Sequence, residues 1–276
     1  MTLQVATRGQ RRLATVKVRQ SITQMSATEV ARFRKALARM LEREDNRGYQ
    51  FFAGWHGVPL GICEHQNPLF LPWHRGYLYH FELALQEIDE EVTLPWWNWM
   101  DEAGVPAAYD VKNADGKANV LASAPVRPMG VPKRPGWPTK TKRDPGGHRP
   151  GEPAGVPPPL RSFYDWMMEA SSYDEFAGRC ERLHDNIHVW VGGANGQMRD
   201  PNWAAFDPIF WAHHTMVDRL WRIWQHSPRG EDPDPSLVET PMTFAKAPSL
   251  RVRDVLHVKQ LGYEYAAQSS TVKGPA

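Results

Sequence analysis

Six of the eleven histidines in this 276-residue chain form two groups of three at spacings that fit metal binding. Neutral imidazole is a borderline donor that suits copper, zinc, iron and nickel, and no carboxylate or thiolate ligand accompanies the two groups. Two neighbouring all-imidazole sites favour a pair of copper ions that act on dioxygen. The first group is His56, His65 and His74, at intervals of nine residues, and the second is His184, His188 and His214.

His184 and His188 are four residues apart, so on a helix both rings project from one face about one turn apart. The same geometry binds zinc in HExxH enzymes, but no Glu follows the first histidine here, which argues against that class of hydrolase. A facing helix that carries His214 would complete the site, as in metal-binding helix bundles. His213 points about 100° away from His214, so we expect that these two do not face one metal. The remaining histidines are interpreted as ordinary: His80, His148, His213, His226 and His257.

Hydrophobic periodicity predicts a mainly α fold. The capping-box pattern from Ser26 to Glu29 begins a helix over about 27–43, and further helices are predicted at about 73–92, 173–190 and 206–226. An extended segment is expected at 94–99 and a short strand near Leu261–Tyr265. The predicted architecture is a four-helix-bundle core that holds a dinuclear copper site, with long irregular loops and a little β.

Residues 103–160 differ in kind from the rest of the chain. Gly and Pro are frequent there and no periodicity survives, so helices and central strands are excluded from much of the segment. We interpret it as a long ordered insertion or a mobile loop inside a single domain of residues 1–276. Twelve Trp residues predict dense aromatic packing, which would also keep a buried metal pair dry.

Charge and hydropathy exclude several classes of partner. A net charge of +2 gives no strongly basic surface that would indicate a nucleic acid or an anionic membrane as a partner. No apolar run is long enough to span a bilayer. The residues after Arg11 and Arg12 lack the apolar region of a secretory signal. Two cysteines, Cys63 and Cys180, cannot build a disulfide framework. We therefore expect a cytoplasmic protein, or one exported together with a partner protein.

The residues around the histidines resemble the two copper motifs of tyrosinases and catechol oxidases. The first motif matches Trp55-His56-Gly57, His65 and the run from Phe70 to Arg75, followed by Phe81-Glu82; the second matches His184 to Gly193 and Asp207 to Asp218. This resemblance covers most of residues 15–100 and 173–265. It implies copper A bound by His56, His65 and His74, copper B bound by His184, His188 and His214, and O2 as co-substrate.

The resemblance extends to the end of the chain. Leu261-Gly-Tyr263-Glu-Tyr265 resembles the tyrosine motif that closes the catalytic core in this family, and eleven residues follow it. We therefore expect a short bacterial-type chain without the C-terminal shielding domain of many latent relatives.

Cys63 stands two residues before His65. In fungal members of the family a Cys-x-His at this position forms a thioether from the sulfur to the second copper A ligand, so the resemblance implies a Cys63–His65 thioether. A free cysteine considered alone is more often a small buried hydrophobe, which is how Cys180 is interpreted.

The resemblance implies oxidation of o-diphenols to o-quinones. Relatives that also hydroxylate monophenols hold a water with a Glu nine residues before the first copper B histidine and an Asn directly after it. Glu175 and Asp185 occupy these positions. Glu175 considered alone is an ordinary charge near a helix start. Monophenols and o-aminophenols are therefore left open as substrates beside small o-diphenols, and a copper chaperone or a homo-oligomer is compatible with this interpretation.

Several other residues are expected around the site. The resemblance places Val189, Arg199, Pro201 and Trp203 at the mouth of the substrate pocket. Val189 is apolar where some relatives carry Arg, so a carboxylate-bearing substrate would lose one possible partner there. Trp203 and Arg199 would narrow or charge the entrance, and a plain surface loop is the equal alternative for residues 199–205. Arg75, Glu82, Asn186 and Asp218 are expected to support the histidines, with Asp218 paired to Arg19.

Two other classes of function compete with the oxidase. A haemocyanin-like dioxygen-binding module uses the same six-histidine site, and a simple catechol assay separates it from an oxidase. A dinuclear zinc hydrolase requires bridging carboxylate ligands that neither histidine group supplies.

Overall fold

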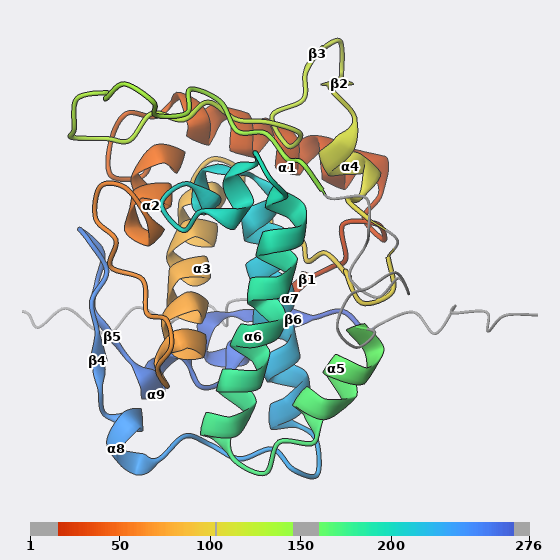
Figure 1. Cartoon of the computed structure of the whole chain (residues 1–276), viewed down its shortest axis with the longest axis vertical. Helices are drawn as coiled ribbons and strands as arrows, with labels where there is room; N and C mark the ends of the chain where they lie inside the picture. Colours follow the sequence, from red (N-terminus) through yellow and green to blue (C-terminus); the bar gives the residue numbers. More distant parts are fainter. Residues whose placement is uncertain (1–15, 103, 146–159, 268–276) are drawn as a thin grey trace, which may run out of the picture.

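The structure, a computed structural model, describes residues 16–102, 104–145 and 160–267, with no account of the side chains of residues 160 and 161 (Figure 1). The predictions that concern Arg11, Arg12, His148 and residues 146–159 of the insertion therefore lie outside the described residues.

Four helices surround the centre of the molecule, and the mainly α fold class is confirmed. α3, α6 and α7 run side by side along the long axis of the molecule, and α1 lies across one end of them (Figure 1). The central helices are α2 (Tyr49–His56), α3 (Phe70–Gln86), α6 (Tyr173–Gly192) and α7 (Ile209–Gln225).

α1 (Ala27–Glu42) follows its sequence signal closely. The hydroxyl of Ser26 accepts from the Glu29 backbone N–H at 3.2 Å, and the Glu29 carboxylate accepts from the Ser26 N–H at 2.7 Å, so the predicted capping box is formed. The apolar stripe of the helix, which includes Phe33 and Leu37, is buried against α2 and α3. α1 therefore supports the two helices that carry His56 and His74.

Two helix predictions differ from the structure. α3 ends at Gln86 rather than near residue 92, because the acidic run that begins at Glu87 is unfavourable at the negative end of a helix dipole. α2 was not predicted from periodicity, because Tyr49–His56 is nearly all buried and thus has no polar face.

The strands are short and lie outside the helical core. β1 (Lys17–Arg19) pairs in parallel with β6 (Tyr263–Tyr265), and so joins the two ends of the described chain. The predicted strand at Leu261–Tyr265 is shorter because a 3₁₀ turn ends at Leu261 and Gly262 adopts a left-handed φ of 82°. The other strands are β2 (Asn113–Ala114), β3 (Lys117–Ala118), β4 (Pro241–Met242) and β5 (Leu250–Arg251). The short helices are α4 (Ala107–Asp110), α5 (Leu160–Met168), α8 (Pro235–Val238), α9 (Val252–Val255), η1 (Gln197–Arg199), η2 (Ala204–Phe206) and η3 (Val258–Leu261).

The described part of the predicted insertion, residues 104–145, is anchored to the core. Tyr109 and Leu121 are fully buried, and the Arg143 guanidinium donates to both carboxylate oxygens of Asp207, just before α7. Of the two interpretations of this segment, the ordered insertion is the one that the described residues fit.

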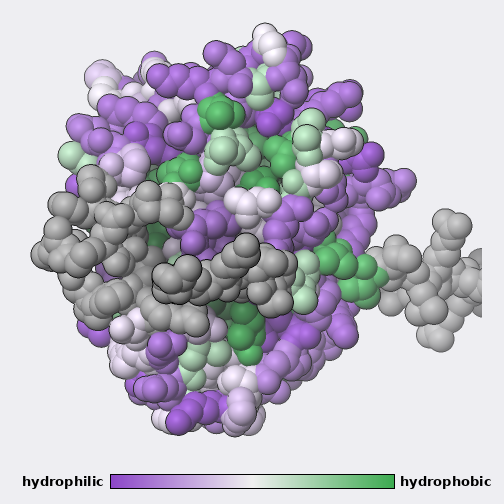
Figure 2. Space-filling model, turned by 90° about the vertical axis from the view of Figure 1, so that its right-hand side faces the viewer, coloured by the Kyte–Doolittle hydropathy of each residue, from purple (hydrophilic) through white to green (hydrophobic). Residues whose placement is uncertain are grey.

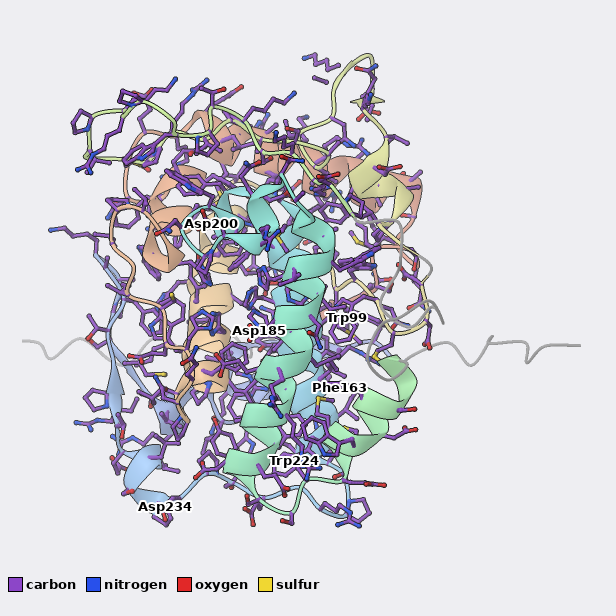
Figure 3. The ribbon with its side chains drawn as sticks, in the orientation of Figure 1. Trp99, Phe163, Asp185, Asp200, Trp224 and Asp234 are labelled. Carbon is purple, nitrogen blue, oxygen red and sulfur yellow. The ribbon has the colours of Figure 1, made fainter. Side chains whose placement is uncertain are left out.

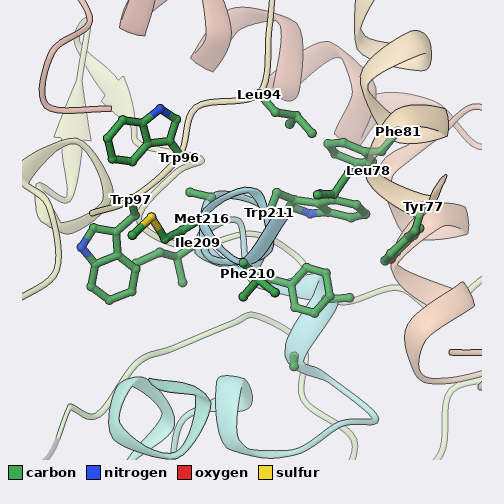
Figure 4. Packing of buried hydrophobic residues seen from close by; sticks show 14 of the residues in the cluster. Tyr77, Leu78, Phe81, Leu94, Trp96, Trp97, Ile209, Phe210, Trp211 and Met216 are labelled. Atoms are coloured by element: carbon green, nitrogen blue, oxygen red, sulfur yellow. The ribbon is translucent and has the colours of Figure 1, made fainter. Parts of the chain in front are cut away.

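Aromatic side chains form most of the core around α7. Phe81 of α3 stacks on Trp211 of α7, with ring centroids 3.4 Å apart and planes 8° apart (Figure 4). Trp96 and Trp97, from the extended segment after α3, lie on the opposite side of α7 (Figure 4). This packing surrounds the histidines with apolar surface and excludes water from their interior side.

Asp218 is the centre of a buried charge network that joins β1, α3, α7 and β6. Its carboxylate accepts from Arg19 at 3.3 Å, from Arg75, and from the hydroxyls of Tyr263 and Tyr265 at 2.6 and 2.5 Å. The Arg19–Asp218 pair that the sequence predicts is therefore present. Burial alone would raise the pKa of Asp218, but the two arginines and the two hydroxyls together hold it below its usual value.

None of the helices in the described ranges is both long and apolar enough to cross a membrane. The side of the molecule at the right of Figure 1 is mostly hydrophilic, with hydrophobic residues in small separate groups (Figure 2).

Candidate metal centre

The six predicted histidines converge at the centre of the helical core. Five of them come from helices: His56 from α2, His74 from α3, His184 and His188 from α6, and His214 from α7. His65 instead lies in the loop between α2 and α3, so the site within the predicted helical core also uses a ligand candidate from a loop. The loop position leaves His65 more accessible than the other five, with 27% of its side chain exposed.

The Nε2 atoms of these rings point at one another. His56 Nε2 and His65 Nε2 are 3.2 Å apart, and His214 Nε2 lies 3.2 Å from His184 Nε2 and 3.3 Å from His188 Nε2. Nitrogen atoms of His56, His74 and His214 also lie within 4.8 Å of one another, so the two histidine groups adjoin. The structure thus brings together the two groups that the sequence predicts.

The Nδ1 atoms of five rings point outward to oxygen atoms. We assign the ring proton to Nδ1 in these cases, because the partner is a carbonyl or carboxylate that accepts. The partners are Pro201 O for His56 (3.1 Å), Glu181 Oε1 for His65 (3.0 Å), Phe70 O for His74 (2.7 Å), Asp185 Oδ1 for His184 (3.0 Å) and Met198 O for His188 (2.7 Å).

This arrangement fits bound metal ions. Burial, followed by the proximity of other histidines, holds the pKa of His184 and of His214 well below the usual value, and burial lowers the pKa of His188 to about 4. Neutral rings that donate through Nδ1 present only lone pairs at Nε2. Two such lone pairs that face one another at 3.2 Å in a buried place repel each other, and a metal cation bound by both nitrogens would remove this repulsion.

Glu181 is the functional residue that the sequence interpretation missed. It is almost fully buried on α6, and its carboxylate accepts from His65 Nδ1 at 3.0 Å and from the backbone N–H of Gln66 at 2.8 Å. Gln66 has a left-handed φ of 56°, so this bond also holds an unfavourable backbone conformation in place. Burial alone would lower the pKa of His65, but hydrogen bonds with Cys63 and Glu181 outweigh burial and raise it to about 9. Copper binding to His65 would therefore release a proton.

His213 is not the ordinary histidine that its position on the helix predicts. Its ring is fully buried, stacks on His184 with centroids 5.0 Å apart, and contacts His188 at 4.7 Å. One of its nitrogens lies within 4.8 Å of ring nitrogens of His184, His188 and His214. His184 of α6 contacts both rings, with centroids 5.0 Å from His213 and 4.7 Å from His214, so their different directions on α7 do not take His213 away from the cluster.

A cavity of about 570 Å³ opens onto both histidine groups. Val189, Arg199 and Pro201 line it, as expected, and Val189 is 53% exposed. Trp203 is absent from its described lining and packs instead against Trp137, with ring centroids 5.2 Å apart, so the structure does not support a gate at Trp203. The cavity is lined by His56, Cys63, His65, Gln66, Glu181, His184, Asp185, His188, Val189, Met198, Arg199, Pro201 and Ala204.

Glu175 and Asp185 are not brought together. Glu175 accepts from the backbone and hydroxyl of Ser171 and from Arg179, near the start of α6, and it does not line the cavity over the histidines. Asp185 lies midway along α6, beside His184, and does line that cavity (Figure 3). The pairing of these two residues around one water is therefore not supported, because the ten positions from Glu175 to Asp185 correspond to about 15 Å of helix.

None of the four residues expected to support the histidines forms a hydrogen bond with one of the six rings in the part of the chain that the structure describes. Arg75 and Glu82 are buried in the framework, where Arg75 donates to Asp218 and Glu82 accepts from Arg19 at 2.9 Å. Asn186 lies on the exposed side of α6 and is not among the residues of the cavity wall. The groups that accept from the rings are instead three backbone carbonyls and the carboxylates of Glu181 and Asp185.

Cys63 lies beside the first histidine group. Its sulfur donates to His56 O at 3.0 Å and is within 4.8 Å of ring nitrogens of His56 and His65. Both cysteines are free thiols in the structure, and Cys180 is buried in the core as predicted. The predicted thioether stays a prediction, with its two partners close together.

The fold and the histidine clusters together define a class: a mainly helical protein whose paired imidazole groups are consistent with a dinuclear copper site. The common central domain of tyrosinase matches residues 46–227, a range that contains all six histidines of the two groups. The chain belongs to the tyrosinase family.

Both enzymes and oxygen carriers are among its relatives. Tyrosinase from Streptomyces antibioticus is 31% identical, over 75% of this chain and 82% of its own length. The G-type hemocyanin of Enteroctopus dofleini is also 31% identical over 75% of this chain, but the chain spans only 8% of that hemocyanin. A tyrosinase from Burkholderia thailandensis has the same fold, with a TM-score of 0.74 and 22% identity over 95% of this chain and 76% of its own.

Proposed function

We propose that this chain is a copper-dependent oxidase that converts o-diphenols to o-quinones with O2, with monophenols or o-aminophenols as further candidate substrates. The observation that carries this proposal is the cavity of about 570 Å³ over the histidines. It reaches both groups and is large enough for a phenolic ring, since small-molecule pockets typically measure about 300–1,000 Å³. A site that only binds dioxygen needs no such space.

Copper A would be held by His56, His65 and His74, and copper B by His184, His188 and His214. A copper pair in this ligand set supplies the reversible one-electron chemistry that links phenol oxidation to dioxygen reduction. In the balanced reaction, each o-diphenol loses two electrons and two protons, and two o-diphenols reduce one O2 to two waters.

The protein's own contribution is to position the substrate and accept its protons. Val189 and Met198 give the cavity an apolar side against which an aromatic ring packs. Asp185 is the carboxylate of the cavity wall next to copper B, and burial raises its pKa above the usual value. A carboxylate of raised pKa is a better acceptor for the phenolic proton. Val189 is apolar, so at this position the cavity wall offers no cationic partner to the carboxylate of an acidic substrate.

The test is a catechol assay with copper-loaded and metal-free protein. We expect two coppers per chain, and one O2 consumed for every two quinones formed. His214→Ala should lose copper and activity, whereas His257→Ala, which removes an exposed histidine far from the cavity, should keep both. Circular dichroism checks that each variant is folded.

An oxygen-binding module is the second candidate, because hemocyanins are relatives of this chain. Reversible O2 uptake by the copper-loaded protein, without any catechol turnover, would establish that function and reject the oxidase. Small phenols are the proposed partners of an oxidase, whereas an oxygen-binding module needs no phenol.

A further inference from the structure

A second cavity, of about 660 Å³, adjoins the one over the histidines. The two cavities share Gln66, Glu181 and Asp185 in their walls. A phenolic ring at the coppers would therefore have open space beside it. A single-ring phenol fills only the first cavity and leaves the second without an occupant.

The floor of the second cavity is one face of α6. Asp174, Gly178, Arg182 and Asp185 follow one another at intervals of four, four and three residues, so they share this face. From Asp174 to Asp185 the floor is about 16 Å long, at a rise of about 1.5 Å per residue. The loop 66–68 and Trp166 of α5 form its sides.

Gly178 packs against none of the residues that the structure describes. Among them, a Cβ built on Gly178 would meet no atom within 4 Å, whereas one on Gly76 or Gly192 would collide with a neighbour. Glycine in a helix interior is less stable than alanine, and Gly178 lies in the interior of a helix of 20 residues. The missing side chain thus keeps the middle of the cavity floor open at a cost to the helix.

The residues around this floor are polar and carry both signs of charge. Gln66 and Arg182 present donors, and Asp174 and Asp185 present acceptors. Trp166 adds an aromatic side, over which the Arg179 guanidinium lies at 4.5 Å from the ring centroid. A chain that offers alternating donors and acceptors, such as a peptide backbone, complements such a surface better than a lipid tail does.

We infer that the second cavity binds the tail of an extended phenolic substrate, a phenol at one end of a flexible polar chain of peptide-like chemistry. This inference rests on the proposed oxidase function. A floor of about 16 Å accommodates about five extended residues. The ring enters the cavity over the histidines past Asp185, and the tail lies along α6 over Gly178.

The test compares two o-diphenols that differ only in their tails. One is dihydroxyphenylalanine amide, and the other is a five-residue peptide that begins with dihydroxyphenylalanine and continues with glycine and serine. With the copper-loaded protein we expect kcat/KM to be about tenfold higher for the peptide, the effect of one or two net hydrogen bonds. Gly178→Trp should fill the floor and remove this preference, while kcat/KM for plain catechol changes by less than about twofold. Gly178→Ala, the matched control, should keep the preference.

A binding experiment separates the cavity from the chemistry. The same peptide with phenylalanine in place of dihydroxyphenylalanine cannot be oxidised, and calorimetry measures its affinity for metal-free protein. Gly178→Trp should weaken this binding at least about tenfold, and Gly178→Ala should not.

Each result decides between the two proposals. Equal kcat/KM for the two o-diphenols, a preference that survives Gly178→Trp, or peptide binding that is absent or insensitive to Gly178→Trp overturns the inference. If the protein still oxidises catechol in that case, the proposed oxidase function is kept. If peptide binding depends on Gly178 but the protein does not oxidise catechol, the second cavity is supported as a peptide-binding site and the oxidase function is rejected.

Discussion

Glu181 and Glu175 lie six residues apart on α6 and offer a matched test of the site. Glu181→Ala removes the acceptor of His65 Nδ1 at 3.0 Å and of the Gln66 N–H at 2.8 Å. Glu175→Ala removes an exposed carboxylate whose partners are Ser171 and Arg179. The two variants make the same chemical change on the same helix, but only the first changes a contact to a predicted copper ligand.

The magnitude follows from the two donors that Glu181→Ala leaves without their acceptor. Each net hydrogen bond contributes about 0.5–1.5 kcal/mol, so the change costs about 1–3 kcal/mol in the orientation of His65. This corresponds to a loss of about 10–100-fold in affinity at the copper that His65 binds, which is the usual effect of removing a residue that orients a metal ligand. The other copper should keep its affinity within about twofold.

The assay is a titration of metal-free protein with copper in competition with a chelator of known affinity. Wild type and Glu175→Ala should bind two coppers alike, and Glu181→Ala should bind one normally and one weakly. Catechol turnover at limiting copper should fall in parallel with the weaker site. The reasoning is refuted if Glu181→Ala binds both coppers as wild type does, or if Glu175→Ala weakens binding equally.

Three further predictions concern stability, pH and covalent structure. Asp218→Ala should lower the free energy of unfolding by about 3–5 kcal/mol, because it removes the carboxylate partner of buried Arg75 and one of the two carboxylate partners of buried Arg19. Glu264→Gln, at a partly exposed pair with Arg222, should cost at most about 1 kcal/mol in urea unfolding. Burial lowers the pKa of His188 to about 4, below its unfolded value of about 6.5, so the unfolded chain binds more protons at acidic pH. His188 should therefore make its full contribution to the stability of the metal-free protein above pH of about 6.5, and this contribution should fall by about 3 kcal/mol as the pH falls to about 4. A flat stability curve over that range contradicts the buried neutral ring. After copper loading in air, the peptide with Cys63 and His65 should be lighter by two hydrogen atoms in mass spectrometry, and an unchanged mass with a titratable Cys63 thiol excludes the thioether.

Much of the site could be predicted from local sequence patterns. The i,i+4 spacing of His184 and His188 defines a ligand pair as soon as that segment is helical, because both rings then share one face. The capping box at Ser26 is equally local, since both of its hydrogen bonds lie within four residues. The sequence motifs around His56, His74 and His214 identify the family for the same reason. The candidate metal ligands are side chains, and the sequence gives the identity of every side chain directly.

The partners of those ligands depended on the tertiary structure. Glu181 stands out only when α6 packs beside the loop of His65, which is 116 residues away in the chain. His56 and His188 are oriented by the backbone carbonyls of Pro201 and Met198, and any residue type has a carbonyl. Contacts of this kind leave no pattern in the order of the residues.

The sequence by itself determined which atoms bind metal and which helix faces carry them, because ligand chemistry and helical periodicity are local properties. Only the packing of α6 against its neighbours decided that His213 lies against the site and that Gly178 borders a second cavity. Those outcomes depend on distances between segments far apart in the chain, and these distances are set by how the whole core fills space.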